Sequence, residues 1–176
     1  MRTVTYGAAC SLDGFIAAAD GAIDWLHFSR DVQDEIRRYW ATIDTMLMGR
    51  KTWDAAVAQG GAGRGGGRSK IATYVFSRTL REAPRGVRLV SSDAGEFVHA
   101  LKRQPGKGIC VMGGGELAQS LFEAGAIDEV GLNIHPVVLG SGVPFFRDAG
   151  RRIPLELAES RTIDGGCVMV TYRVRR

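Results

Sequence analysis

One stretch decides the fold of this chain: Gly108-Ile109-Cys110-Val111-Met112-Gly113-Gly114-Gly115-Glu116-Leu117-Ala118. Its first five residues form an apolar run, which indicates a buried strand. After the three glycines, Leu117, Leu121 and Phe122 recur at helical spacing, and Gly125 supplies a stop. A helix that starts at a glycine turn leaves its first N–H groups unpaired, and the helix dipole there favours a ligand phosphate. A tight turn with positive φ is the alternative, but three glycines between a strand and a helix favour a nucleotide.

The composition is that of one ordinary globular domain. The chain has 176 residues, of which 45% are hydrophobic and 24% charged, so we expect a single domain over residues 1–176. No apolar run reaches the roughly 20 residues of a membrane helix, and no apolar secretion segment opens the sequence, which predicts a cytoplasmic protein without a membrane partner. Three cysteines, at 10, 110 and 167, are widely spaced. They favour buried free thiols over disulfides, and the histidines do not pair with them as a metal site requires.

The charge balance excludes one class of partner. The net charge of +4 comes mostly from arginine, yet no run of like charge is long and aromatic residues do not interleave with the arginines. A nucleic-acid platform needs both features, so we expect no nucleic-acid partner. A modest basic excess suits an anionic small molecule, although a solvated surface explains it equally well.

Strands alternate with helices along most of the chain. An N-cap at Ser29 precedes apolar residues at helical spacing, from Val32 to Ile43. Further helices are expected to open at Gly49, to span 93–102 and to follow the glycine triplet. The expected strands are 3–11, 44–48, 71–76, 87–90, 108–112, 128–135, 155–163 and 167–174, the last two joined by a hairpin at Asp164-Gly165-Gly166. This order predicts an α/β fold with a mostly parallel sheet and an antiparallel C-terminal hairpin.

A glycine-rich segment interrupts this alternation. Residues 59–69 hold six glycines and two arginines. Such a composition cannot bury enough apolar area to offset the entropy of ordering it, so we expect a mobile surface loop. Whether that loop orders when a ligand binds is left open by the sequence.

Three motifs resemble the dihydrofolate reductase superfamily. Met48-Gly49-Arg50-Lys51-Thr52-Trp53 is similar to the segment whose backbone and basic residues hold the NADPH phosphate. Phe76-Ser77-Arg78 resembles the strand end that contacts the adenosine side of that cofactor. Met112-Gly113-Gly114-Gly115 resembles the turn under the pyrophosphate, where the family carries a cis bond, here Gly113–Gly114. The resemblance implies a three-layer α/β/α fold.

Other motifs look closer to a neighbouring branch, the reductase domain of the riboflavin-biosynthesis bifunctional deaminase-reductase and its stand-alone relatives. They are Ser11-Leu12-Asp13-Gly14-Phe15-Ile16-Ala17, Asp128-Glu129-Val130 and the run from His135 to Phe146. The resemblance implies an NADPH-dependent reductase of a small heterocycle, similar to 5-amino-6-(5-phosphoribosylamino)uracil reductase. No zinc motif of the His-x-Glu and Cys-x-x-Cys kind is present, so no fused deaminase is expected.

The resemblance also implies which residues meet NADPH. A cofactor with a ribose phosphate needs a cation and donors near a helix start, which Gly49 to Thr52 offer, although solvated charges are the alternative. Glu116 departs from the pattern, because some relatives have a basic residue there and a carboxylate repels phosphate unless it points away or caps its helix. The implied set is Ala9, Ile16, Gly49, Arg50, Lys51, Thr52, Ser77, Arg78, Gly113, Gly114, Gly115, Glu116, Leu117 and Ala118.

The reacting end is less specified. Dihydrofolate reductases place a carboxylate early in the helix that follows a tryptophan, and Asp31 after Trp25 is the nearer match. Asp31 could instead serve the helix dipole, and Asp34 could pair with Arg38 at i+4. Asp13 is the rival acid. Trp25 and Asn133 are the candidate substrate contacts, with packing and the end of a hydrogen-bond ladder as alternatives.

Two other functions and one assembly stay open. Authentic dihydrofolate reduction is one alternative, although no arginine for a folate glutamate can be identified. A protein that binds NADPH without catalysis is the other. The riboflavin-type branch usually pairs through its sheet edge, so we expect a homodimer, with Val143 to Phe146 as an apolar patch that could equally pack inward.

Overall fold

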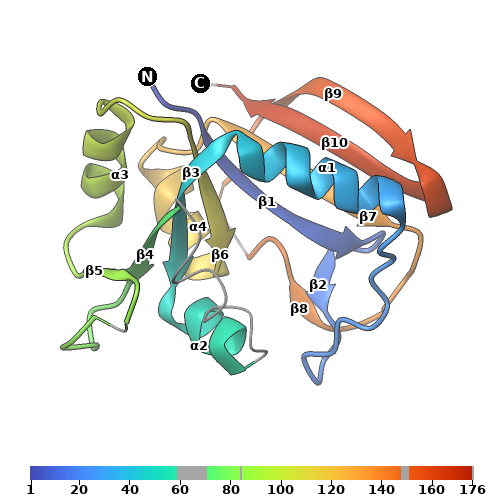
Figure 1. Ribbon diagram of the computed structural model, residues 1–176, viewed down its shortest axis with the longest axis horizontal. Helices are drawn as coiled ribbons and strands as arrows, with labels where there is room; N and C mark the ends of the chain where they lie inside the picture. The colour runs from blue at the N-terminus through green and yellow to red at the C-terminus, as the bar shows by residue number, and fades with distance from the viewer. Residues whose placement is uncertain (59–70, 84, 148–150, 176) are drawn as a thin grey trace.

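The computed structural model describes residues 1–58, 71–83, 85–147 and 151–175. A twisted eight-stranded sheet crosses the molecule in the order β5-β4-β3-β6-β1-β7-β10-β9 (Figure 1). The strands from β5 to β1 in this order, and β7 beside β1, all run parallel to one another. Strand β10 is antiparallel to both of its neighbours, β7 and β9. The strands are β1 (Val4–Ser11), β3 (Ile43–Gly49), β4 (Ala72–Phe76), β5 (Arg88–Val90), β6 (Gly108–Gly113), β7 (Glu129–His135), β9 (Leu155–Ile163) and β10 (Cys167–Val174).

Helices cover both faces of the sheet. They are α1 (Arg30–Ala41), α2 (Arg50–Ala58), α3 (Ala94–Lys102) and α4 (Gly115–Glu123). The Ser29 hydroxyl caps α1 by accepting from the Val32 N–H, as its sequence predicts, and Asp93 caps α3 through the Glu96 N–H. The predicted three-layer α/β/α architecture is therefore confirmed.

The apolar core lies mainly between the sheet and the helices α3 and α4. Side chains that alternate along the strands face these helices, among them Val4, Tyr6 and Val111, and they meet Leu121 and Phe122 of α4. On the other face, Trp53 of α2 packs with Met48 and Val75. Because successive side chains of a strand point to opposite faces of the sheet, one face packs its apolar side chains under α3 and α4, and the other face lies under α1.

Most predicted elements are found within two residues of their expected ends. The chief addition is a two-stranded sheet of β2 (Phe15–Ala17) and β8 (Val143–Pro144), which holds the loop after β1 against the segment before Arg147. A short 3₁₀ turn, Asp164–Gly166, joins β9 to β10 where a hairpin is predicted. The three cysteines are buried and free, as expected. The glycine-rich loop predicted at 59–69 lies outside the described residues.

Candidate functional site

Parallel strands bring the predicted cofactor motifs to one edge of the sheet. Strands β3, β4 and β6 lie side by side, with Gly49 in register with Phe76 and Met48 with Gly113. Ser77 and Arg78 therefore follow β4 at the same edge at which the glycine triplet follows β6. Ligands of open α/β sheets bind outside the carboxyl ends of the strands, which is this edge.

The triplet forms a cradle lined by backbone. The bond between Gly113 and Gly114 is cis, as the resemblance implies, and Gly113 has φ of +113°. Among the described residues, no side chain caps α4 at Gly114. A Cβ on Gly114 would lie 3.2 Å from the Thr52 hydroxyl, and one on Gly49 would lie 3.2 Å from the Gly114 nitrogen. The uncapped helix start and the bare backbone around it suit a phosphate group.

Glu116 does not stand alone beside this cradle. Its carboxylate pairs with Lys51 at 3.5 Å and with Arg147 at 3.3 Å, and all three side chains are largely exposed. The Arg147 side chain lies over Gly115, where a Cβ would come within 2.6 Å of its Cγ. The two cations balance the carboxylate, so the repulsion expected between Glu116 and a phosphate is reduced. Sequence reasoning missed Arg147, which is 31 residues from Glu116.

The other predicted cofactor cations differ in their pairing. Arg50 donates from Nε to both carboxylate oxygens of Asp54, at 2.8 and 2.7 Å, one turn along α2. Arg78 is exposed, and no ion pair joins it to another described residue. The hydroxyl of Ser77 accepts from the N–H of Leu80 at 3.0 Å and so ties the turn after β4. Arg78 is thus the freer cation at this edge.

Two predicted cofactor contacts point into the core. The side chains of Leu117 and Ala118 are buried among the core residues, and the Ala118 N–H already donates to the Gly114 carbonyl. The side chains of Leu117 and Ala118 therefore do not face a ligand at this turn. Ile16 is half-buried and packs against the same core, whereas Ala9 is half-buried on the opposite face of β1. The backbone N–H of Ala118 is therefore not available to donate a hydrogen bond to a cofactor.

A second, buried polar cluster lies on the sheet face that α1 covers. Asn133 of β7 is in register with Ala9 of β1, and His135 follows two residues later on the same face. The Asn133 amide lies 3.2 Å from His135 Nε2, and the backbone N–H of His27 donates to His135 Nδ1 at 3.0 Å. Trp25 packs edge-on against the His135 ring, with centroids 5.7 Å apart. Both predicted substrate residues therefore meet at His135.

The two candidate acids, Asp13 and Asp31, have different surroundings. The Asp13 carboxylate accepts from Ser11 Oγ at 2.6 Å and from the N–H groups of Leu139 and Gly140, and these bonds, led by the Ser11 one, hold its pKa below the usual range. Asp31 is exposed in the first turn of α1. No contact joins it to Asn133, and its catalytic role stays a prediction.

The buried acid of α1 is Glu35, which sequence reasoning did not single out. Its carboxylate pairs with Arg161 of β9 and with Arg38, and only 8% of the residue is exposed. The hydrogen bond from Arg161 is the main cause that lowers its pKa. Asp34 pairs with Arg37 at i+3, and the alternative pairing of Asp34 with Arg38 is wrong, because Arg38 turns to the buried Glu35.

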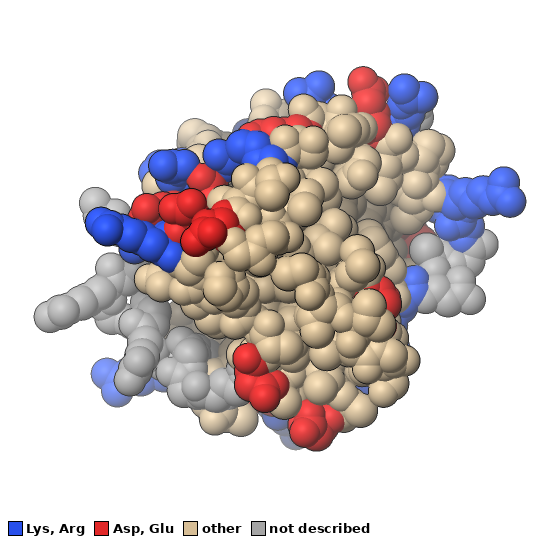
Figure 2. Space-filling view, turned by 90° about the vertical axis from the view of Figure 1, so that its right-hand side faces the viewer, with Lys and Arg blue, Asp and Glu red and all other residues tan. Residues whose placement is uncertain are grey.

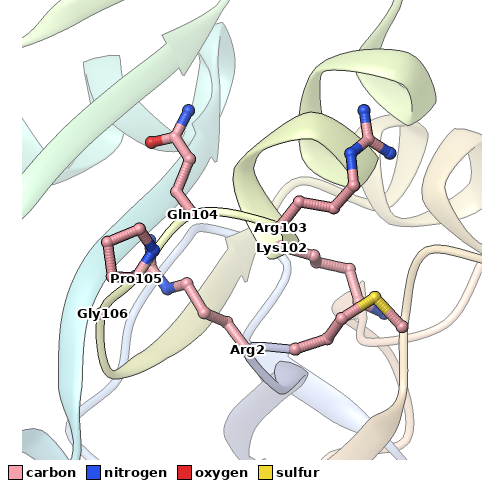
Figure 3. Close-up of a pocket in the computed structure, with 7 residues that line it drawn as sticks. Arg2, Lys102, Arg103, Gln104, Pro105 and Gly106 are labelled. Carbon is pink, nitrogen blue, oxygen red and sulfur yellow. The ribbon is translucent and has the colours of Figure 1, made fainter.

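A hollow of about 540 Å³ opens at the opposite end of the sheet (Figure 3). It lies near the amino ends of the strands, and its two buried cations are already paired, Arg2 with Asp44 and Lys102 with Asp128. Because its two buried cations are paired and it lies at the opposite ends of the strands from the glycine triplet, we place the site at the carboxyl edge. Its lining residues are Met1, Arg2, Lys102, Arg103, Gln104, Pro105 and Gly106.

Comparisons with known proteins agree on one family. The RibD C-terminal domain matches residues 2–169. The chain is 34% identical to the protein YyaP of Bacillus subtilis (strain 168), over 97% of this chain and 94% of that one, and 32% identical to YwjB of the same organism, over 97% of each.

Solved structures extend the likeness to the fold. A putative riboflavin biosynthesis protein from Shewanella sp. PV-4 superposes with a TM-score of 0.84 at 26% identity, over 99% of this chain and 100% of that one. The deaminase/5-amino-6-(5-phosphoribosylamino)uracil reductase of Thermotoga maritima gives 0.73 at 16%, over 99% of this chain and 57% of that one. A dihydrofolate reductase from Enterococcus faecalis complexed with NADP(H) gives 0.69 at 16%, over 99% and 97%.

Proposed function

Because this chain belongs to the RibD C-terminal domain family, we propose that it is an NADPH-dependent reductase that transfers hydride to a small heterocycle similar to 5-amino-6-(5-phosphoribosylamino)uracil. The chain is a reductase with the dihydrofolate reductase-like fold, related to riboflavin biosynthesis. We propose NADPH as its cofactor and a C=N or C=O bond of the heterocycle as its target.

The observation that carries the proposal is the cradle at Gly113 to Gly115. Backbone without Cβ atoms lies beside an uncapped helix start, and the Thr52 side chain lies against it. We assign the pyrophosphate to this cradle, where N–H groups and the dipole of α4 favour an anion. Lys51 and Arg147 flank it and would add cationic contacts.

The preference for NADPH rests on cations beyond the cradle. Arg78 is exposed at the end of β4, and Arg50 lies at the start of α2, next to Gly49. A ribose phosphate between these two side chains would gain charge-assisted hydrogen bonds that NADH cannot make. The Asp54 carboxylate, which now holds Arg50, would have to release part of its contact.

The chemistry that the chain must support is modest. A bound nicotinamide cofactor supplies the hydride, which adds to the carbon of a C=N or C=O bond while the electron pair moves to nitrogen or oxygen. The chain's own residues bind and orient the ring beside Ala9, Trp25 and Asn133. Their hydrogen-bond and ion-pair partners lower the pKa values of Asp13 and Glu35, which favours the ionised form of both. We therefore assign the proton to Asp31 or to water.

The direct test is an assay of NADPH oxidation with 5-amino-6-(5-phosphoribosylamino)uracil, run beside dihydrofolate. We expect turnover of the first compound and little of the second. Turnover of dihydrofolate alone would establish the dihydrofolate reductase alternative. Tight NADPH binding without turnover of any pteridine or ribosylamino-pyrimidine would establish the alternative of a binding protein without catalysis.

We also propose a homodimer that pairs through the sheet edge. Every residue of β9 from Leu155 to Thr162 is exposed, and Leu157 is 54% exposed. Figure 2 shows a broad face with few charged side chains on the side that is at the right in Figure 1, where the β9–β10 hairpin ends, although β9 itself carries Glu156, Glu159 and Arg161. Of the predicted apolar patch, Val143 and Phe146 are exposed, but Phe145 packs inward on Tyr6 with ring centroids 4.2 Å apart. Light scattering that returned the mass of one 19.0 kDa chain would contradict the dimer.

A further inference from the structure

The buried polar cluster under α1 contains one unsatisfied group. Asn133 is only 9% exposed, and the other atom of its side-chain amide, placed as Oδ1, is buried and has no hydrogen-bond partner among the described residues. Its neighbours in register, Ala9 and Met169, have no strong polar group. Buried amides are normally paired, so a group without a partner in the described part of the chain suggests a partner from outside.

The protonation of His135 decides which amide atom this group is. The His27 backbone N–H, a fixed donor, points at Nδ1 from 3.0 Å, so Nδ1 must hold a lone pair. The Cys167 thiol, 3.5 Å from Nδ1, is consistent with the same assignment. Burial, aided by the nearby His27, lowers the pKa of His135 and favours the neutral ring. A neutral ring with a bare Nδ1 carries its proton on Nε2.

That proton fixes the orientation of the Asn133 amide. Nε2–H is a donor, and the amide atom 3.2 Å from it must therefore be the oxygen. A half-turn of the amide about its last bond exchanges the two ends, which places the NH₂ group at the position without a partner. If the amide instead turned its NH₂ group toward Nε2, both His27 and Asn133 would donate to a neutral ring that has only one acceptor nitrogen.

We infer that Asn133 presents its NH₂ group to the substrate, and that His135, held by the His27 backbone, is the positioning residue that sets this polarity. The sheet face beside Asn133 is not fully covered, since Ala9, Gly131 and Met169 are all half-buried. The complementary ligand is a planar heterocycle that offers an acceptor there, a carbonyl oxygen or an unprotonated ring nitrogen. The inference about the ligand rests on the proposed function; the inference about His135 does not.

The His135 assignment can be tested without any ligand. In ¹⁵N-labelled protein, two-bond correlations from the ring C–H protons report which imidazole nitrogen carries the proton. The chain has three histidines, and the spectrum of His135→Gln identifies the signals of His135. We expect the proton on Nε2 alone at neutral pH. A proton on Nδ1, or a doubly protonated ring, would overturn the inference.

Two ring probes test the polarity of Asn133 in the presence of NADPH. In 5,6-diaminouracil two carbonyl groups accept, whereas in 2,4-diaminopyrimidine the corresponding amino groups donate. Replacing NH₂ by oxygen in Asn133→Asp should weaken binding of the first probe about tenfold or more and leave the second unchanged or tighter. An equal loss for both probes, or none, would refute the assignment. If the wild-type protein does not oxidise NADPH in the activity assay, that result bears on the proposed function only and not on the polarity of Asn133.

A matched pair of substitutions tests the positioning role of His135. Glutamine places an amide N–H near the position of Nε2 and can still donate to Asn133, whereas asparagine places its amide near Nδ1 and cannot. We expect His135→Gln to keep KM for the heterocycle within about threefold and His135→Asn to raise it about tenfold, with kcat changed less. Equal KM values in the two variants would mean that His135 only fills space.

Discussion

The carboxyl edge of the sheet around Gly113 to Gly115, which we call the glycine edge, and the polar cluster under α1 are built from different parts of the chain. At the glycine edge, bare backbone at Gly49, Gly113 and Gly114 makes the cradle, and exposed ion pairs surround it. Under α1, side chains make the site: Asn133 and His135 are buried and linked through backbone from a distant loop. We infer from this difference that main chain at a helix start would hold the phosphate, whereas a fixed side-chain polarity would recognise the reacting ring.

The largest effect is expected from Gly113→Ala. Gly113 has φ of +113°, a conformation that costs a non-glycine residue about 1–3 kcal/mol. The strained turn would shift the cradle, and we expect NADPH affinity to fall about a hundredfold, measured by titration. Gly125→Ala is the control, because Gly125 also has positive φ, +64°, but ends α4 far from the cradle. Comparable loss of affinity in both variants would show that general strain, not the cradle, is responsible.

Arg50→Ala should separate the two nicotinamide cofactors. If Arg50 turns from Asp54 to a ribose phosphate, its loss should raise KM for NADPH about tenfold and leave KM for NADH nearly unchanged. Arg37→Ala is a matched control, since Arg37 is also exposed and paired along its own helix, with Asp34. Steady-state kinetics with both cofactors measures the effect. Equal changes for NADPH and NADH would remove Arg50 from the phosphate site.

Glu116→Gln should produce a smaller change in the opposite direction. Without the carboxylate, Lys51 and Arg147 are released toward the phosphates, so we expect NADPH to bind about threefold more tightly, and less so at high salt. Glu123→Gln at the other end of α4 is the control. Weaker binding of NADPH to Glu116→Gln would mean instead that Glu116 holds the two cations in place.

The smallest effect concerns Asp13 and acid stability. Its folded-state pKa is lowered, chiefly by the Ser11 hydroxyl, so its contribution is present above the unfolded pKa of about 3.9 and is lost as pH falls through the lower folded value. We expect Asp13→Asn to lower Tm by a few degrees at pH 7 and by less near pH 3. A Tm difference that grows toward acid would contradict this sign.

The glycine edge could be predicted from the sequence because its parts are contiguous. The triplet, Gly49 to Thr52 and Ser77-Arg78 each follow a strand, and parallel strands end together, so local motifs suffice to place them. The ion pair of Arg147 with Glu116 could not be found this way, since β8 and the turn after it had no strand signal of their own.

The cluster under α1 depends on pairings that local patterns do not contain. His27 meets His135 across 108 residues, and Arg161 meets Glu35 across 126. The helical spacing of α1 predicts an inward face with Val32, but Glu35 lies there too, because Arg161 of the edge strand β9 compensates its charge. Asp31 is the predicted acid because dihydrofolate reductases place a carboxylate early in the helix that follows a tryptophan, and that resemblance does not point to Glu35.

The most direct test of the account is a titration of the protein with NADPH and, separately, NADH, followed through tryptophan emission. We expect saturable quenching by both cofactors, with NADPH bound about tenfold more tightly through its extra phosphate. Absence of binding by either cofactor, or tighter binding of NADH, would contradict the assignment of the glycine edge to NADPH.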